Sequence, residues 1–298
     1  MTAMKAGTNS DPGTGPVRLE REFAYLPEDF RYLAGLAREK TGIVFGEHKS
    51  ELVYLRISRR LRALKLTSFK AYVQLLKADR DGEETGHMVN ALTTNVTQFF
   101  RSPGHFDHLQ DRVFPDCSAR IRDGHAQRIR LWSAGCSGGE EPYSMAIAAL
   151  EHFGPRLGAL DLKILATDID TDRLGAAEDG FFSGDNLNDM PKTTRNRYFD
   201  RVGRKTEDRF RVKPGLRELL LIKRLNLLEE WPMKGEFDAI FCRNVMIYLS
   251  NEAKAELVRR FTGLLRPGGW FYLGTAESLP FSEPGLVREG GTIYRWQP

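Results

Sequence analysis

The sequence predicts an α/β fold in which a doubly wound, mostly parallel sheet follows a small all-α domain and carries an inserted β-subdomain. After residue 128, short apolar runs typical of buried strands alternate with helical patterns, as in parallel sheets with right-handed crossovers. Residues 26–91 are helical in pattern throughout. Residues from about 180 to 221 interrupt the alternation. At 298 residues, the chain is long enough for a catalytic domain and a smaller one.

The amino-terminal domain is expected over residues 22–94 as four short helices. The first helix begins at Pro27, and Glu28 and Asp29 follow in its first turn, where negative charge suits the helix dipole. The other helices are expected at about residues 49–64, 68–77 and 84–94, because apolar residues recur there at helical spacing. Residues 1–21 begin with a stretch rich in Gly, Ser, Thr and Pro and are expected to form a disordered tail, not a signal peptide.

The sheet domain is expected over residues 128–298, after a linker helix and connector at 95–127. Strands are expected at residues 128–134, 162–170, 237–245 and 269–275, and helices at 143–153, 172–178 and 251–265. The β-subdomain is expected as an insertion at about 181–222. Within it, residues 209–213 suit a strand and residues 216–223 suit a strand or a helix.

The composition is that of an ordinary soluble globular protein, with 41% apolar and 28% charged residues. A net charge of +4 does not by itself indicate nucleic-acid binding. The cysteines at 117, 136 and 242 lack metal-site or disulfide spacing and are expected to be reduced thiols of a cytoplasmic protein. His105 and His108 have no carboxylate to complete a metal site, so no metal is expected. No apolar run approaches the ~18 residues of a membrane span, and we expect a monomer without membrane insertion.

The stretch LWSAGCSGGEEPYSMAI at residues 131–147 has the form strand, glycine turn and helix start that is typical of a nucleotide-binding corner. Gly135 lies in the turn, and Pro142 suits the first turn of the helix. Glu140 and Glu141 would repel a pyrophosphate at this helix start. They favour a cofactor without phosphate and with cationic groups, which describes S-adenosylmethionine. Glu141 is expected to face the amino-acid end of this cofactor, and Glu140 to cap the helix or face solvent.

Asp168 ends the second expected strand, where this fold places a carboxylate against ribose hydroxyls. The alternative is that Asp168 caps the next helix, but Asp170 is the better candidate for that cap. Asn226 and Leu227, in the segment KRLNLLEE, are expected to bracket an adenine.

The segment TTNVTQFFRSPGHF at residues 93–106 joins the two domains. Phe99 and Phe100 are expected to anchor it in the core, while Asn95, Thr97 and Arg101 point into a cleft.

The strand at 237–245 ends in Arg243 and Asn244, and Tyr248 follows shortly after it. The carboxyl ends of the strands face the reaction centre in this fold, so these polar side chains are functional candidates. Tyr248 is the natural substrate contact.

These motifs together resemble the CheR family of chemotaxis receptor protein-glutamate O-methyltransferases. The resemblance runs from about residue 22 to 294 and rests on the segments LTTNVTQFFR, SAGCSGGEEPYS, ATDID, NLL, FDAIFCRNVMIYL and LRPGGWFYLG. It implies a class I S-adenosylmethionine-dependent methyltransferase with S-adenosylhomocysteine as product. The implied activity is methylation of glutamate side chains on the helical cytoplasmic arms of chemoreceptors, forming glutamyl methyl esters for chemotaxis adaptation.

The resemblance also implies roles for single residues. The positions matching the family's cofactor-binding residues are Asn95, Thr97, Arg101, Glu141, Asp168, Asn226, Leu227, Arg243 and Asn244, to which the turn adds Gly135. Arg101 and Tyr248 match residues close to the reacting centre. In some relatives the β-subdomain binds a peptide at the receptor's carboxyl terminus. Residues 200–213 here lack the glycine-flanked Val-Arg run that such binding would need.

A basic stretch at residues 49–77 suits an acidic receptor arm, since it holds eight basic residues against the single acid Glu51. Its candidate docking residues are Arg56, Arg59, Arg60 and Arg62. The alternative for this stretch is a solvated helix face. Two rival functions remain open at this point: a nucleic-acid methyltransferase that uses the basic residues on phosphates, and a non-catalytic scaffold that senses the cofactor.

Overall fold

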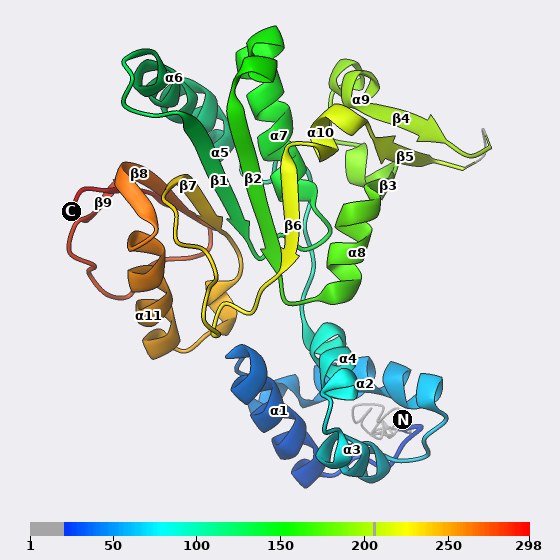
Figure 1. Ribbon diagram of the computed structural model, residues 1–298. Coiled ribbons are helices and arrows are strands. Elements are labelled where there is room, and N and C mark those ends of the chain that lie inside the picture. The colour runs from blue at the N-terminus through cyan, green and yellow to red at the C-terminus, as the bar shows by residue number, and fades with distance from the viewer. Residues whose placement is uncertain (1–20, 205–206) are drawn as a thin grey trace, which may run out of the picture.

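The computed structural model describes residues 21–204 and 207–298, so all but the last residue of the expected tail lies outside the described residues. The four expected amino-terminal helices are confirmed: α1 (Pro27–Thr41), α2 (Ser50–Leu64), α3 (Phe69–Ala78) and α4 (Glu83–Leu92). They pack around a separate apolar core that includes Leu33, Ile57, Phe69 and Met88. Figure 1 shows this domain below the strand tips of the larger domain.

The larger domain contains a seven-stranded sheet in the order β6-β2-β1-β7-β8-β10-β9. The first five strands in this order run parallel, and β10 and β9 form an antiparallel edge. The strands are β1 (Arg128–Ala134), β2 (Asp161–Asp168), β6 (Leu220–Arg224), β7 (Phe237–Cys242), β8 (Leu265–Leu273), β9 (Leu286–Gly290) and β10 (Ile293–Trp296). The doubly wound, mostly parallel sheet is therefore confirmed.

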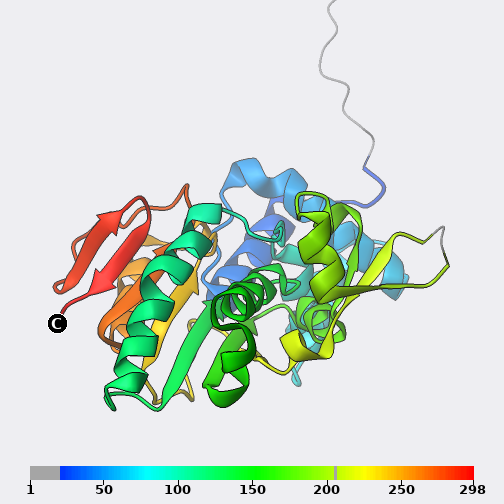
Figure 2. The ribbon, with the colours of Figure 1, turned by 90° about the horizontal axis from the view of Figure 1, so that it is seen from above.

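Helices cover both faces of this sheet because side chains alternate along each buried strand. On β1, Leu131 packs on the side of α7 (Glu140–Phe153), and Trp132 packs on the side of α11 (Asn251–Thr262). The remaining helices are α5 (Pro103–His108), α6 (Phe114–Arg122), α8 (Thr171–Asp179), α9 (Lys192–Tyr198) and the short α10 (Pro214–Arg217). Seen from above, the antiparallel edge and the β-subdomain lie at opposite ends of the molecule (Figure 2).

The β-subdomain is a three-stranded antiparallel sheet in the order β3-β5-β4. Its strands are β3 (Phe181–Ser183), β4 (Phe199–Val202) and β5 (Arg209–Val212). The insertion expected at about 181–222 extends too far, because β6 pairs with β2 in the large sheet. Only the four-residue helix α10 precedes β6, so the alternation of strands and helices does not show that this edge strand belongs to the large sheet.

The two domains meet at the carboxyl edge of the parallel strands. Gly42, which ends α1 with a φ of 72°, comes close to the second domain there. A Cβ at this position would lie 2.9 Å from Leu228 Cδ1 and 3.1 Å from Leu249 Cδ2. The Val44 N–H also donates to the carbonyl oxygen of Tyr248 at 3.0 Å. The helical domain therefore closes the space beyond the strand ends, where this fold binds ligands.

Candidate active site

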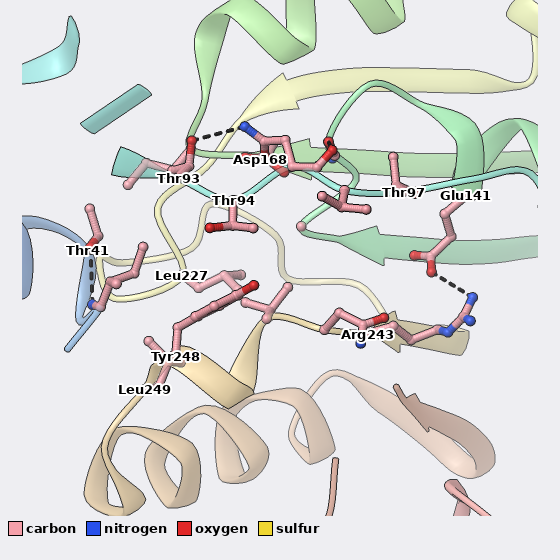
Figure 3. Close-up of a pocket in the computed structure, with 18 of the residues that line it drawn as sticks. Thr41, Thr93, Thr94, Thr97, Glu141, Asp168, Leu227, Arg243, Tyr248 and Leu249 are labelled. Carbon is pink, nitrogen blue, oxygen red and sulfur yellow. Dashed lines mark hydrogen bonds and ion pairs between the residues drawn. The ribbon is translucent and has the colours of Figure 1, made fainter. Parts of the chain in front are cut away.

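A pocket lies between the strand ends and the helical domain (Figure 3). All ten residues predicted to bind a cofactor line it, together with Tyr248. These are Asn95, Thr97, Arg101, Gly135, Glu141, Asp168, Asn226, Leu227, Arg243 and Asn244. The helical domain contributes Thr41 and Ile43.

The glycine turn brings the backbone close to the opposite wall of the pocket. Gly135 has a φ of 85°, and a Cβ there would lie 2.3 Å from Val245 Cγ2. The N–H groups of Gly135 and Cys136 both donate to the Thr167 carbonyl oxygen, at 2.7 and 2.9 Å. A side chain larger than hydrogen at Gly135 would therefore disturb the turn and push the following loop aside.

Glu141 and Arg243 form a buried ion pair at one end of the pocket. Arg243 Nη1 lies 3.0 Å from Glu141 Oε2, and Ser133 Oγ donates to Glu141 Oε1 at 2.7 Å. Arg243 also donates to the carbonyl oxygen of Arg101. Burial raises the pKa of Glu141, and Arg243 and Ser133 oppose that shift. Each carboxylate oxygen keeps an acceptor site, so Glu141 can still accept from a cationic ligand group.

Glu140 was expected to cap the helix or to face solvent, and the structure shows that it does not face solvent. Glu140 is the first residue of α7 and is only 6% exposed. No hydrogen-bond partner reaches its Oε2 among the described residues, and burial raises its pKa. The carboxyl faces back toward Gly138, where a Cβ would lie 2.9 Å from Oε2.

Asp168 lies at the carboxyl end of β2 with both oxygens held by backbone donors. The N–H of Ser137 donates to Oδ2 at 2.8 Å, and the N–H of Asp170 donates to Oδ1 at 2.9 Å. Burial raises the pKa of Asp168, and these backbone donors oppose the shift. Asp170, not Asp168, caps α8 by accepting from the N–H groups of Asp172 and Arg173, as expected. Asp168 also lines the pocket, and a carboxylate has about four acceptor positions, so it can still accept from a ligand.

The linker between the domains forms one wall of the pocket. Phe99 is buried and contacts Phe182 and Phe199, which confirms its role as a core anchor. Phe100 and Ser102 have φ angles of 52° and 60°, a left-handed conformation uncommon for such residues. Strained backbone of this kind persists where packing holds it, and it is common at functional sites.

Within this linker, Arg101 donates to the carbonyl oxygen of Val96 at 3.0 Å and is half-buried. Its guanidinium therefore lies at the pocket wall and keeps further donors free. The amide nitrogen of Asn95 helps to hold the linker in place. Its Nδ2 donates to Asp170 Oδ2 at 2.7 Å and lies 3.0 Å from Thr93 Oγ1.

The loop after β7 is held by Glu277, which the sequence analysis missed. Glu277 accepts from the backbone N–H groups of Asn244 and Gly274, each at 2.6 Å, and from that of Ile247 at 3.2 Å. Asn244 has a φ of 60°. Tyr248 follows in the same loop, and Figure 3 shows its side chain extending into the pocket. Glu277 follows the carboxyl end of the neighbouring strand β8, and this position was the available signal in the sequence.

Asn226 ties the pocket to the helical domain. Its Nδ2 donates to the carbonyl oxygen of Lys40 at 2.7 Å, and its Oδ1 accepts from the Leu228 N–H at 3.1 Å. Both polar atoms of this side chain are thus hydrogen-bonded at the junction of the two domains. The backbone of this segment and the Leu227 side chain remain as candidate contacts for an adenine.

The four arginines predicted to dock a substrate do not form one free basic surface. Arg56 donates to groups at the end of α4, and Arg60 forms an ion pair with Glu84 at 2.5 Å. Arg62 pairs with Glu22 at 2.5 Å. Arg59 is exposed and makes no side-chain hydrogen bond or ion pair within the described part of the chain. The sequence shows charge along a helix but not the partners that neutralise it.

Other pocket residues had no role in the sequence analysis. They are Thr41, Ile43, Thr93, Thr94, Val96, Gln98, Ser137, Ile169, Leu225, Leu228, Val245 and Leu249. Most are one or two positions from a predicted residue, so proximity to the strand ends and to the linker could have identified them. Across residues 21–204 and 207–298, no group of three or more His, Cys, Asp or Glu side chains could hold a metal ion. No helix in that same part of the chain is long and apolar enough to cross a membrane.

The fold and the pocket define a methyltransferase that uses S-adenosylmethionine. The residues present fit this cofactor, because the glycine turn comes close to the ligand and the acidic helix start after it does not suit a phosphate group. Glu141 suits the cationic amino-acid end, and the Asp168 carboxylate at the end of β2 suits ribose hydroxyls.

Comparison with known proteins gives the particular family. Residues 95–292 match the SAM-binding domain of CheR methyltransferase, and residues 28–93 match its all-alpha domain. Chemotaxis protein methyltransferase 2 of Pseudomonas aeruginosa is 42% identical over 94% of this chain and 96% of its own length. Chemotaxis protein methyltransferase of Escherichia coli is 37% identical over 93% of this chain and 94% of its own. This chain belongs to the CheR methyltransferase family.

A solved structure of PKMT2 from Rickettsia typhi with AdoHcy is also similar. It is 16% identical, covers 49% of this chain and 21% of its own, and has a TM-score of 0.31. A score of this size carries no argument about this chain.

Proposed function

We propose that this enzyme transfers a methyl group from S-adenosylmethionine to glutamate side chains on the helical cytoplasmic arms of chemoreceptors. The observation that carries the proposal is the presence of two donors, Arg101 and Tyr248, in the same pocket as Glu141 and Asp168. The relatives' name, chemotaxis protein methyltransferase, supports a chemotaxis substrate. The product would be a glutamyl methyl ester.

A glutamate carboxylate needs little activation. Its reference pKa is about 4.3, so it is ionised at neutral pH and no general base is required. The bound cofactor supplies an electrophilic methyl group on a sulfonium. The work of the chain's own residues is then to hold the carboxylate oxygen in line with this group at near-attack distance.

Arg101 and Tyr248 are proposed to hold that carboxylate. The hydrogen bond from Arg101 to the neutral Val96 carbonyl is easily exchanged, because a charged acceptor forms a stronger bond with a guanidinium. The buried Arg243 donates a hydrogen bond to the Arg101 carbonyl oxygen, so the Arg101 side chain can move while its backbone stays in place. Tyr248 is placed by the domain junction through its own carbonyl, and its hydroxyl can donate the second bond.

Arg59 and Arg62 are proposed to dock the receptor arm. Arg59 is exposed without a bonded partner among the described residues, and the Arg62 pair with Glu22 lies in solvent, where exchange costs little. The affinity for an acidic arm should therefore be salt-sensitive. A cytoplasmic location suits both the receptor arms and the three buried free thiols, Cys117, Cys136 and Cys242.

The test is methyl transfer from radiolabelled S-adenosylmethionine to receptor-enriched membranes. The proposal expects label on the receptor and requires wild-type Tyr248 for full rate. Label on added nucleic acid but not on the receptor would support the nucleic-acid rival. Cofactor binding without any transfer would support the non-catalytic scaffold.

A further inference from the structure

Arg56 makes a set of contacts that a docking residue would not need. Its Nη1 donates to the carbonyl oxygens of Leu92 and Thr93 at 2.5 and 2.8 Å, and its Nη2 donates to Thr94 Oγ1 at 2.9 Å. These three acceptors belong to consecutive residues. The Arg56 guanidinium thus binds the chain where α4 ends and the interdomain linker begins.

These hydrogen bonds are favourable because they form at the carboxyl end of α4. The last carbonyl groups of a helix have no donor within the helix, and their partial negative charge favours a nearby cation. Thr93 follows α4 with extended backbone (φ −67°, ψ 151°). Arg56 satisfies the Leu92 and Thr93 carbonyls from α2 and so fixes the direction in which the linker leaves the helix.

The linker continues directly into the cofactor pocket. Residues 93–98 all line that pocket. Thr93 Oγ1 donates to Asp170 Oδ2 at 2.7 Å, and the Asp170 N–H donates to Asp168 Oδ1 at 2.9 Å. A continuous set of hydrogen bonds therefore connects the fixed linker to the carboxylate proposed to bind the ribose.

We infer that Arg56 is a positioning residue for the cofactor pocket. The inference concerns cofactor binding alone, so its test does not depend on which carboxylate is methylated. It also gives two basic residues of α2 different roles, because Arg59 lies three residues further along this helix and has no bonded partner within the described residues.

The same substitution at both positions separates the two roles. Lysine keeps the positive charge but cannot reproduce the planar fork that reaches three acceptors. We expect Arg56→Lys to raise the dissociation constant for S-adenosylhomocysteine about tenfold, consistent with the loss of one charged hydrogen bond or more. Arg59→Lys, the matched control, should bind S-adenosylhomocysteine within about twofold of the wild type, since no pocket contact changes.

Calorimetry on the full chain, without receptor, measures both the dissociation constant and the fraction of binding-competent protein. General destabilisation would lower the competent fraction and leave the dissociation constant of the remainder unchanged. A rise in the dissociation constant at unchanged stoichiometry supports positioning. Wild-type affinity in Arg56→Lys overturns the inference.

A second variant tests the other end of the same connection. Thr93→Val keeps the branched shape but removes the hydroxyl that reaches Asp170. It should also weaken S-adenosylhomocysteine binding at unchanged stoichiometry. If both Arg56→Lys and Thr93→Val bind normally, the linker is not held for the cofactor by these contacts.

Discussion

Replacing Asp168 by asparagine tests the assignment of the ribose contact. The change keeps the shape of the side chain and exchanges one acceptor oxygen for an NH2 donor. In the wild type, both oxygens accept backbone N–H groups, from Ser137 at 2.8 Å and from Asp170 at 2.9 Å. Whichever way the amide turns, its NH2 meets one of these donors. The site is 9% exposed, so water offers little compensation.

The magnitude follows from the bonds that are lost. One charged hydrogen bond to the backbone disappears, which we expect to destabilise the fold by about 2 kcal/mol. The proposed ribose contact also loses one of two acceptors. At about 1.5–3 kcal/mol for a hydrogen bond to a charged group, binding of S-adenosylhomocysteine should weaken by roughly 10- to 150-fold.

The assay is calorimetric titration of Asp168→Asn with S-adenosylhomocysteine, together with thermal unfolding. Asp172→Asn is the matched control, since Asp172 is exposed in the first turn of α8 and does not line the pocket. It should bind within about twofold of the wild type. A folded Asp168→Asn protein that binds within twofold of the wild type would refute the ribose assignment.

The remaining predictions concern catalysis, the loop after β7, the glycine turn and pH. Tyr248→Phe should leave S-adenosylhomocysteine affinity unchanged and lower kcat about tenfold or more, as expected for one substrate hydrogen bond; full turnover in a methyl-transfer assay would remove Tyr248 from the mechanism. Glu277→Gln should lower stability by about 2 kcal/mol, because an amide can accept from only some of the three backbone donors at Asn244, Ile247 and Gly274; unchanged urea unfolding would contradict this. Gly135→Ala should impair folding and cofactor binding together, since the turn has a φ of 85° and the new Cβ would lie 2.3 Å from Val245 Cγ2; wild-type thermal unfolding and affinity would show that the turn can relax. Burial raises the pKa values of Asp168 and Glu141 from 3.8 and 4.5, so acidification should weaken S-adenosylhomocysteine binding at a pH above those ordinary values. Because the pKa of each carboxyl is higher in the folded than in the unfolded protein, protonation of these two groups should stabilise the fold as the pH falls, while the affinity for S-adenosylhomocysteine drops. Affinity that holds down to the ordinary pKa values would contradict the shifts.

The parts of the site that the sequence predicted lie at strand ends and in one short linker. Asp168 and Arg243 follow apolar runs whose parallel pairing brings their carboxyl ends to one edge, so strand periodicity was enough to place them. Glu141 was placed by the glycine turn that precedes it. These are local signals, and each needs only the element on which the residue lies.

The parts that the sequence did not predict depend on contacts between distant segments. Arg56 meets Leu92, 36 residues away, and Glu277 meets Asn244, 33 residues away. Charge spacing on α2 therefore suggested a docking surface at Arg56 and Arg60, whereas both are committed to internal partners. Strand β6 was assigned to the insertion for a related reason, because only its pairing with the distant strand β2 shows that it belongs to the large sheet.

The chemical nature of the product tests the central claim most directly. Receptor labelled with radioactive methyl groups by this enzyme is digested, the labelled peptide is isolated, and the peptide is treated with mild base. A glutamyl methyl ester hydrolyses under these conditions, so the account predicts release of the label as volatile methanol and recovery of an unmodified glutamate. Label that stays on the peptide in base would mean that the methyl group is on nitrogen or carbon, and would contradict the account.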